Sequence, residues 1–133
     1  PSDGFALLEN DVANYVTAGA YDNSTNYRFT PQTAGKYVVY ATVFTGGASS
    51  GSSSHGGFIT NIKKNGSDAS YNSFYLYNNT TGTDGSKSAS IVLDMNGSSD
   101  YLEVLGRFDV SSGTTGFMGN GYCTCNVWKL ITS

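Results

Sequence analysis

The chain has 133 residues, of which 13% are charged, and its formal net charge is −3. A chain of this length forms one domain, so residues 1–133 are treated as a single unit. The small negative charge supplies no basic field for nucleic acid or for an anionic membrane surface, and no apolar run reaches the roughly 20 residues of a membrane span. Seventeen glycines and ten tyrosines beside two prolines favour an all-β protein with many turns.

Short apolar or alternating runs predict a series of strands separated by turns rich in Gly, Asn and Ser. In chain order these are residues 4–9, 12–17, 27–30, 36–44, 57–64, 71–77, 88–94, 101–108 and 121–131. The dipeptide Asn65-Gly66 predicts a tight hairpin between two of them, and residues 94–100 predict a second turn. No helical pattern of useful length appears. Many short strands with glycine-rich turns indicate a sandwich or jelly roll.

The run from Tyr37 to Phe44 is apolar on both of its faces. Alternation along a strand sends one set of side chains to one side and the other set to the other: Tyr37, Val39, Ala41 and Val43 against Val38, Tyr40 and Phe44. A strand of a small antiparallel sandwich normally keeps one face wet. Burial of both faces therefore predicts a partner beyond the protein's own core, and we expect that partner to be another copy of the chain.

A second strand is rich in tyrosine, and Tyr71, Tyr75 and Tyr77 share one of its faces. Aromatic side chains are enriched at subunit interfaces because they bury a large area with few rotatable bonds. We expect these tyrosines at an interface. The alternative is an exposed ladder of tyrosines that pack across neighbouring strands.

Three segments, residues 46–57, 78–85 and 110–116, are predicted to be exposed loops. Loops carry binding function more often than sheets do, although a Gly/Ser-rich segment can also be a plain flexible connection. If the loops bind a ligand, the candidate contact residues are Ser53, His55, Asn79, Thr81, Asp84 and Thr114.

The residues do not predict catalysis. His55 is the single histidine and falls in a predicted flexible loop, and the acidic residues have no metal-site or phosphate-loop spacing. On a strand, Cys123 and Cys125 point to one face about 6.5 to 7 Å apart, which is at or beyond the usual reach of a disulfide. We expect two reduced, partly buried thiols. The alternative is a pair near a symmetry axis that bridges subunits or holds a soft metal.

A set of short motifs resembles the globular head domain of complement component q and its tumour necrosis factor relatives. Tyr21-Asp22, Phe29-Thr30, Gly35 and Tyr37 match one motif of that family. The segments 62–66 and 88–93 resemble its Leu-x-Lys-Asn-Gly hairpin and its small-residue strand, and 93–104 resembles its Leu-x-x-Gly-Asp-x-Val element. Ala34 stands where the family usually has proline, and the last strand lacks the usual Phe-Ser-Gly-Phe. The resemblance extends from about Phe5 to Ile131.

This resemblance implies an all-β, ten-stranded antiparallel jelly-roll sandwich that assembles as a trimer about a threefold axis. Together with the two-faced strand it predicts the following trimer-interface residues: Tyr37, Val38, Tyr40, Phe44, Tyr71, Tyr75, Tyr77 and Tyr101. We expect no cofactor. Because some members of the family bind calcium near the trimer apex, the resemblance leaves calcium open, with Asp100 or the Asp84 loop as its ligands.

The function predicted is that of a non-enzymatic virion structural protein: a trimeric surface module such as a phage fibre knob, a head fibre or a capsid decoration protein. The Arg-Phe-Thr-Pro and Ala-Gly-Lys-Tyr motifs resemble phage and bacterial versions of the fold. Its expected partners are two further copies of itself, other virion proteins and a glycan or protein receptor on a cell surface, with no nucleic acid and no membrane insertion. The expected location is the virion surface, or the extracellular space in the alternative below.

Two alternatives remain open. A glycan-binding sandwich would stack exposed aromatic residues such as Tyr15, Tyr21 or Trp128 on sugar rings, although Trp128 is expected in the core because it lies in the last strand. A secreted, complement-q-like recognition protein would carry glycans on Asn-x-Ser/Thr sequences, which here begin at Asn23, Asn65, Asn78, Asn79 and Asn96.

Overall fold

The structure of the chain is a computed structural model. It describes the backbone of residues 6–7, 20–22, 24–46, 54–81, 85–112, 116–117 and 123–130, and the side chains of residues 20–22, 24–44, 59–73, 86–107 and 123–130. All described elements are strands and turns. Within these parts of the chain, no helix is long and apolar enough to cross a membrane.

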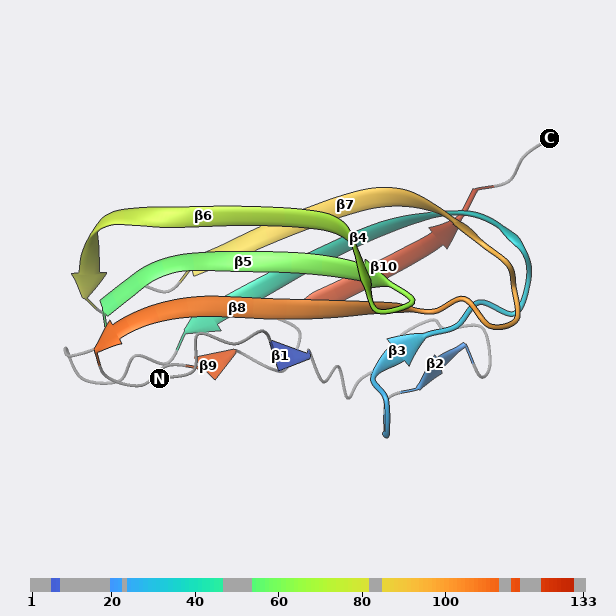
Figure 1. The fold of residues 1–133 in the computed structure, drawn as a ribbon, viewed down its shortest axis with the longest axis horizontal. Coiled ribbons are helices and arrows are strands. Elements are labelled where there is room, and N and C mark those ends of the chain that lie inside the picture. Colours follow the sequence, from blue (N-terminus) through green and yellow to red (C-terminus); the bar gives the residue numbers. More distant parts are fainter. Residues whose placement is uncertain are drawn as a thin grey trace.

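Ten strands among the described residues form two antiparallel sheets that pack as a sandwich (Figure 1). The strands are β1 (Ala6–Leu7), β2 (Tyr21–Asp22), β3 (Arg28–Phe29), β4 (Gly35–Gly46), β5 (Ser54–Lys64), β6 (Ser67–Thr81), β7 (Gly85–Met95), β8 (Leu102–Ser112), β9 (Gly116–Phe117) and β10 (Thr124–Lys129). The six-stranded sheet has the order β2-β3-β8-β5-β6, with β1 beside β8. The four-stranded sheet has the order β10-β4-β7, with β9 beside β4.

Strand β4 provides one wall of the core, as its alternation predicts. Tyr37, Val39, Ala41 and Val43 point inward and are at most 5% exposed. Ile62, Leu102 and Val104 of the six-stranded sheet complete the buried cluster from the opposite side. Fully burying an aliphatic side chain of this size contributes about 1.5–3 kcal/mol, so this contact between the sheets is the main source of stability.

The hairpin between β5 and β6 is confirmed at Asn65-Gly66. Both residues have positive φ, 51° at Asn65 and 79° at Gly66, and the flanking Lys64 and Ser67 are paired. Two consecutive positive φ angles define the type I′ turn, which matches the twist of the strands that it joins. Asn65 also ties this turn to its neighbour, because its Oδ1 accepts the Tyr101 amide at 2.9 Å and its Nδ2 donates to Asp100 at 2.8 Å.

The turn between β7 and β8 is organised by Asn96. Its side-chain oxygen accepts the backbone amides of Ser98, Ser99 and Asp100 at 2.9–3.0 Å. Gly97 lies inside this turn with φ +75°, and a Cβ built there would come within 2.2 Å of the Ala34 nitrogen. The turn therefore packs directly against the backbone that leads into β4, and only glycine fits at this position.

The predicted strands lie within or overlap the observed ones wherever the structure describes them, but several observed strands are longer. Strand β5 begins at Ser54, β6 continues to Thr81 and β8 to Ser112. The predicted loops 46–57, 78–85 and 110–116 are therefore partly wrong, because composition alone could not show that their outer residues pair with one another. Ser54, for example, pairs with both Thr81 and Ser112. The predicted strand 12–17 lies outside the described residues.

Candidate interaction face

The outward-pointing side chains of β10, β4 and β7 form a surface that we call the neutral face. The strand register sets its rows: Trp128 lies opposite Val38, and Val38 lies opposite Val92. Trp128 is 55% exposed and Val92 is 52% exposed, although both are large apolar residues. A row of exposed apolar side chains on a sheet is a candidate contact surface.

A cluster of hydroxyl groups lies beside this apolar row. The Tyr40 hydroxyl donates to Ser88 Oγ at 3.0 Å, and Ser88 Oγ lies 2.8 Å from Thr42 Oγ1. Because Tyr40 reaches a residue of the neighbouring strand on the same face, its ring lies along the sheet instead of standing away from it. The ring is 41% exposed, so it presents a fixed aromatic surface.

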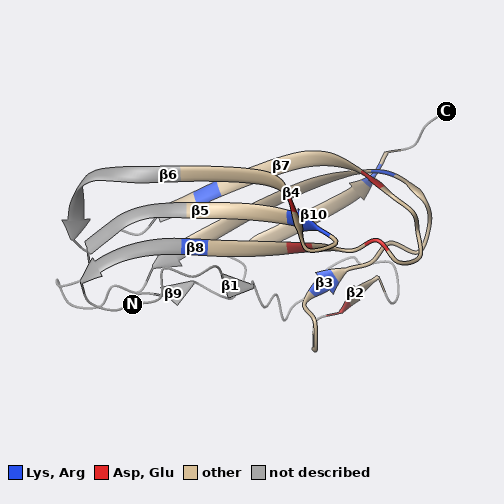
Figure 2. Ribbon diagram, in the orientation of Figure 1, with Lys and Arg blue, Asp and Glu red and all other residues tan. Residues whose placement is uncertain are grey.

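Charge occurs only at one end of the neutral face within its described side chains. There the Lys36 Nζ lies 2.8 Å from both carboxylate oxygens of Asp94. Leu130 follows at the same end, where its amide donates to the Lys36 carbonyl. Figure 2 shows the middle of β4, β7 and β10 in tan, the colour of uncharged residues. The remainder of the face is apolar or carries only hydroxyl and amide groups.

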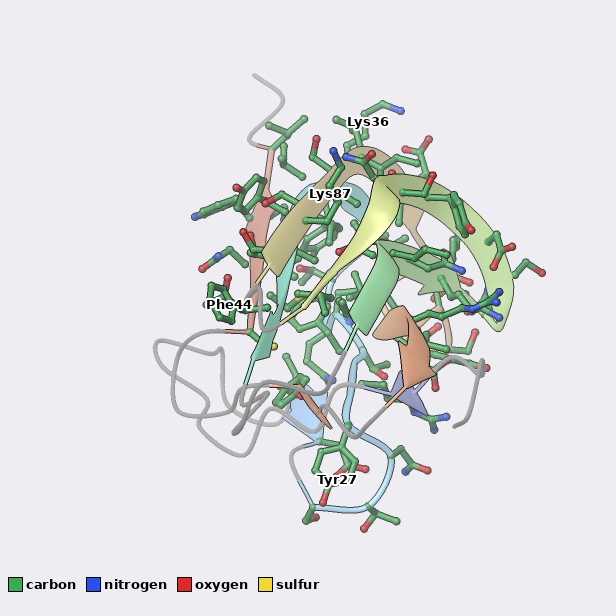
Figure 3. All side chains as sticks on the ribbon, turned by 90° about the vertical axis from the view of Figure 1, so that its left-hand side faces the viewer. Tyr27, Lys36, Phe44 and Lys87 are labelled. Atoms are coloured by element: carbon green, nitrogen blue, oxygen red, sulfur yellow. The ribbon has the colours of Figure 1, made fainter. Side chains whose placement is uncertain are left out.

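The predicted interface residues do not form one surface. Val38, Tyr40 and Phe44 lie on the neutral face, and Figure 3 shows Phe44 pointing away from the sandwich. Tyr37 was wrongly grouped with them: it is 5% exposed and its hydroxyl donates to the Thr33 carbonyl at 2.7 Å inside the fold. Alternation requires this result, because Tyr37 has the opposite parity to Val38 and Tyr40.

The tyrosines predicted on other strands lie elsewhere. Tyr71 is 50% exposed on the outer face of the six-stranded sheet, opposite Asn61. The Tyr101 ring is covered within the chain by the Arg28 guanidinium, 4.5 Å from the ring centroid. The side chains of Tyr75 and Tyr77 lie outside the described residues.

Three exposed apolar residues at the neutral face were absent from the predicted interface: Val92, Trp128 and Leu130. The prediction that Trp128 belongs to the core is wrong. Val127 takes the inward position on β10 and packs against the core, so Trp128 must point outward. Only the register of β10 on β4 decides which of the two residues points outward, and this register cannot be read from the sequence.

The predicted ligand-contact residues are divided between strands and undescribed parts of the chain. His55 lies on β5 opposite Thr80 and Val110, and Asn79 and Thr81 lie on β6, so their placement in flexible loops was wrong. Backbone pairing between the extended ends of β5, β6 and β8 overrides the loop-like composition. Ser53, Asp84 and Thr114 lie outside the described residues.

Cys123 and Cys125 form no disulfide, and both are half-buried against the core, in agreement with the prediction of partly buried thiols. Burial raises the pKa of Cys125 to about 12, so this thiol stays protonated at neutral pH. Cys123 Sγ donates to the Phe44 carbonyl and accepts the Phe44 amide, both at 3.3 Å. Neither thiol lies on the neutral face.

Asp100, one of the two calcium candidates, is already engaged within the chain. Its carboxylate accepts from Asn65 Nδ2 at 2.8 Å and from the Asn96 amide at 3.0 Å, and it lies 2.9 Å from Lys64 Nζ. The hydrogen bond from Asn65 is the largest cause of a lowered pKa. Among the described side chains, no three His, Cys, Asp or Glu residues gather as metal ligands.

No protein-family model matches the chain, and no curated protein matches it significantly.

Proposed function

We propose that this protein is a non-enzymatic structural module that assembles with two further copies of itself into a trimer on the surface of a virion. The observation that carries the proposal is the neutral face, where exposed Trp128 and Val92 flank half-buried Val38 in one apolar row. A sheet face that is exposed to water normally carries polar or charged residues at these positions. Contact with another copy explains why this one does not.

The connectivity supports the jelly-roll part of the proposal. Among the long strands β4 to β8, only the β5–β6 hairpin stays within one sheet. The connections from β4 to β5, from β6 to β7 and from β7 to β8 each pass from one sheet to the other (Figure 1). Connections that cross between two antiparallel sheets are typical of jelly rolls, which occur in viral capsid proteins.

The virion setting is supported by composition and by the resemblance to phage versions of the complement-q-like fold. A low fraction of charged residues, with solubility left to Ser, Thr, Asn and Gly, suits a rigid external module. In a trimer, three copies of each loop would lie at one end, so that weak contacts with a receptor add by avidity. A fibre knob would use this end for attachment, and a capsid decoration protein would use it for docking on the virion.

One observation favours a second function, that of a glycan-binding sandwich. Exposed Trp128 and the flat-lying Tyr40 ring belong to adjacent rows, with the amide of Asn126 opposite Tyr40. Aromatic surfaces bordered by hydroxyl and amide groups suit the stacking of sugar rings. In this case the same face would remain open in a monomer.

Native mass spectrometry, or light scattering after gel filtration, separates the two functions. The proposed trimer predicts one species of three times the 14.0 kDa chain mass that persists on dilution. A monomer or a dimer at micromolar concentration would contradict the trimer. A monomer whose intrinsic tryptophan fluorescence changes on titration with a glycan would instead support the second function.

A further inference from the structure

The two sheets meet along one long side of the sandwich, where β6 and β7 are the terminal strands of their sheets. Figure 1 shows both strands along this side of the molecule. Strand β7 pairs with β4 on one edge only, so its other edge presents backbone groups that an added strand could use. What occupies those groups decides whether this edge is open to other chains.

Side chains of the six-stranded sheet occupy the carbonyls of β7. Asn72 Nδ2 donates to the Ser88 carbonyl at 2.6 Å, and Ser70 Oγ donates to the Ser90 carbonyl at 3.1 Å. On the neighbouring strand, Thr60 Oγ1 donates to the Lys87 carbonyl at 2.6 Å.

The spacing of these bonds is regular. Two residues forward on β6, from Ser70 to Asn72, correspond to two residues backward on β7, from Ser90 to Ser88. The two strands therefore pass each other in antiparallel register, as in a ladder, but with side-chain donors in place of backbone amides. At the far end, Lys64 Nζ donates to the Asp94 carbonyl at 2.5 Å and extends the same series.

This arrangement also accounts for polar residues at inward-facing positions. Ser70 and Asn72 have the same parity on β6, opposite Ile62 and Thr60, and a sandwich core would ordinarily place apolar side chains there. Ser70 and Asn72 are half-buried, and each satisfies its polar group by donating to a backbone carbonyl of β7. Ser70 and Asn72 therefore contribute hydrogen bonds, and not apolar packing, to the contact between β6 and β7.

We infer that Ser70 and Asn72, supported by Lys64, close the edge of β7 and prevent other chains from adding a strand to it. The unwanted partner is a second copy of this chain, paired edge to edge through β7. The inference is independent of the proposed trimer, because it concerns an edge and not the neutral face. It holds whether the native protein is a trimer or a monomer.

The test compares Ser70→Ala/Asn72→Ala with wild type by sedimentation velocity and thioflavin T fluorescence over a range of concentrations. We expect the fraction of protein in species larger than the native assembly to rise several-fold and to grow with concentration. Ser73→Ala is the matched control, because Ser73 lies on the same strand but on the outward side, opposite Ile59. It should behave as wild type.

Loss of hydrogen bonds also lowers stability, so a second comparison separates this effect from edge opening. Val104→Ala removes core volume on β8, away from the β7 edge. At temperatures chosen so that both variants have the same unfolded fraction, only the double variant should form the larger species. Equal association by the two variants, or none by the double variant, would overturn the inference. The native mass of wild type, measured separately, tests the proposed trimer alone.

Discussion

The outer faces of the two sheets differ in charge. The face of the six-stranded sheet carries Lys63, Asp68, Glu103 and Arg107 at outward positions, and Lys63 Nζ lies 3.5 Å from Asp68 Oδ1. The neutral face carries Val38, Val92 and Trp128 at equivalent positions, with one ion pair at its end.

The proposed trimer explains this difference, because the neutral face would be its contact face and the outer face of the six-stranded sheet, which we call the charged face, would remain in solvent. Outward charges keep a sheet in water and oppose association, because each would have to lose its hydration in a dry interface. Exposed valine and tryptophan gain from the same desolvation. Both faces belong to one small domain, so the contrast reflects the role of each face and not the overall composition of the chain.

Placing a charge at the centre of the neutral face should remove the difference between the two faces and have the largest effect on assembly. Val38→Asp puts a carboxylate between Trp128 and Val92, where an assembled protein would bury it without a partner. We expect assembly to be lost, with a cost of about 3–5 kcal/mol for an unpaired buried charge, while the monomer keeps its fold. Native mass and circular dichroism measure the two effects separately.

The control for this variant is Tyr71→Asp on the charged face. Tyr71 is 50% exposed and points outward from the six-stranded sheet, so its replacement introduces the same charge away from the neutral face. It should leave the assembly intact. If Tyr71→Asp dissociates the protein and Val38→Asp does not, the assignment of the two faces is reversed.

A second change should lower stability without altering which face associates. Gly97→Ala forces a left-handed conformation on a residue with a side chain and brings its Cβ within 2.2 Å of the Ala34 nitrogen. The conformational cost and the clash together should destabilise the fold by about 3 kcal/mol or more, a fall in Tm of roughly 10 °C. The fraction that remains folded should still assemble, in contrast to Val38→Asp.

Gly66→Ala isolates the contribution of the clash. Gly66 has a similar φ of +79°, but a Cβ there would meet only the Tyr101 hydroxyl at 3.7 Å. Only the conformational cost of about 1–2 kcal/mol should remain. Thermal unfolding of the two variants measures the difference, and equal losses of stability would contradict the close approach at Gly97.

The sequence was sufficient for features that depend on neighbours in the chain. The alternation placed Tyr37, Val39, Ala41 and Val43 together on one face of β4, although it did not show which face meets the core, and the Asn65-Gly66 dipeptide set the hairpin. Each of these features follows from the conformations and periodicity of a few consecutive residues. Such features are local and can be read from the sequence alone.

Features that depend on pairing between distant strands could not be predicted. Val127 and Trp128 are both apolar, so alternation alone allowed either to point inward, and only the register on β4 decides. The length of β5 was missed for the same reason, since the pairing of Ser54 and His55 comes from β6 and β8. The two-residue strands β2 and β9 also exist only through their partners.

Lowering the pH should destabilise the fold through carboxylates outside the neutral face, with a smaller effect than the substitutions above. Hydrogen bonds to Ser24, Thr25 and Asn26 lower the pKa of Asp22, and a hydrogen bond from Asn61 lowers the pKa of Asp68 on the charged face. A lowered carboxyl pKa adds stability that is complete above the unfolded value of about 3.9 and is lost as pH falls through the lower folded value.

We therefore expect Tm to be nearly constant between pH 7 and pH 5 and to fall below about pH 4. The native mass of the folded protein should not change between pH 7 and pH 5, because the only carboxylate on the described neutral face is Asp94 at its end. Scanning fluorimetry and native mass across this range measure both quantities. Asp22→Asn should flatten the acid limb of the Tm curve, and an unchanged limb would show that this carboxylate does not contribute.

The smallest expected effect is the response of assembly to salt. Raising NaCl from 0.1 M to 1 M shortens the Debye length from about 10 Å to about 3 Å and screens exposed charge pairs, but it does not weaken apolar burial. Association through the neutral face should therefore keep its dissociation constant within about two-fold over this range, as measured by sedimentation equilibrium. Contact through Lys63, Glu103 and Arg107 would instead weaken markedly as salt rises. A strong loss of affinity at high salt would assign the interface to the charged face. An unchanged affinity would support an interface centred on Trp128, Val38 and Val92.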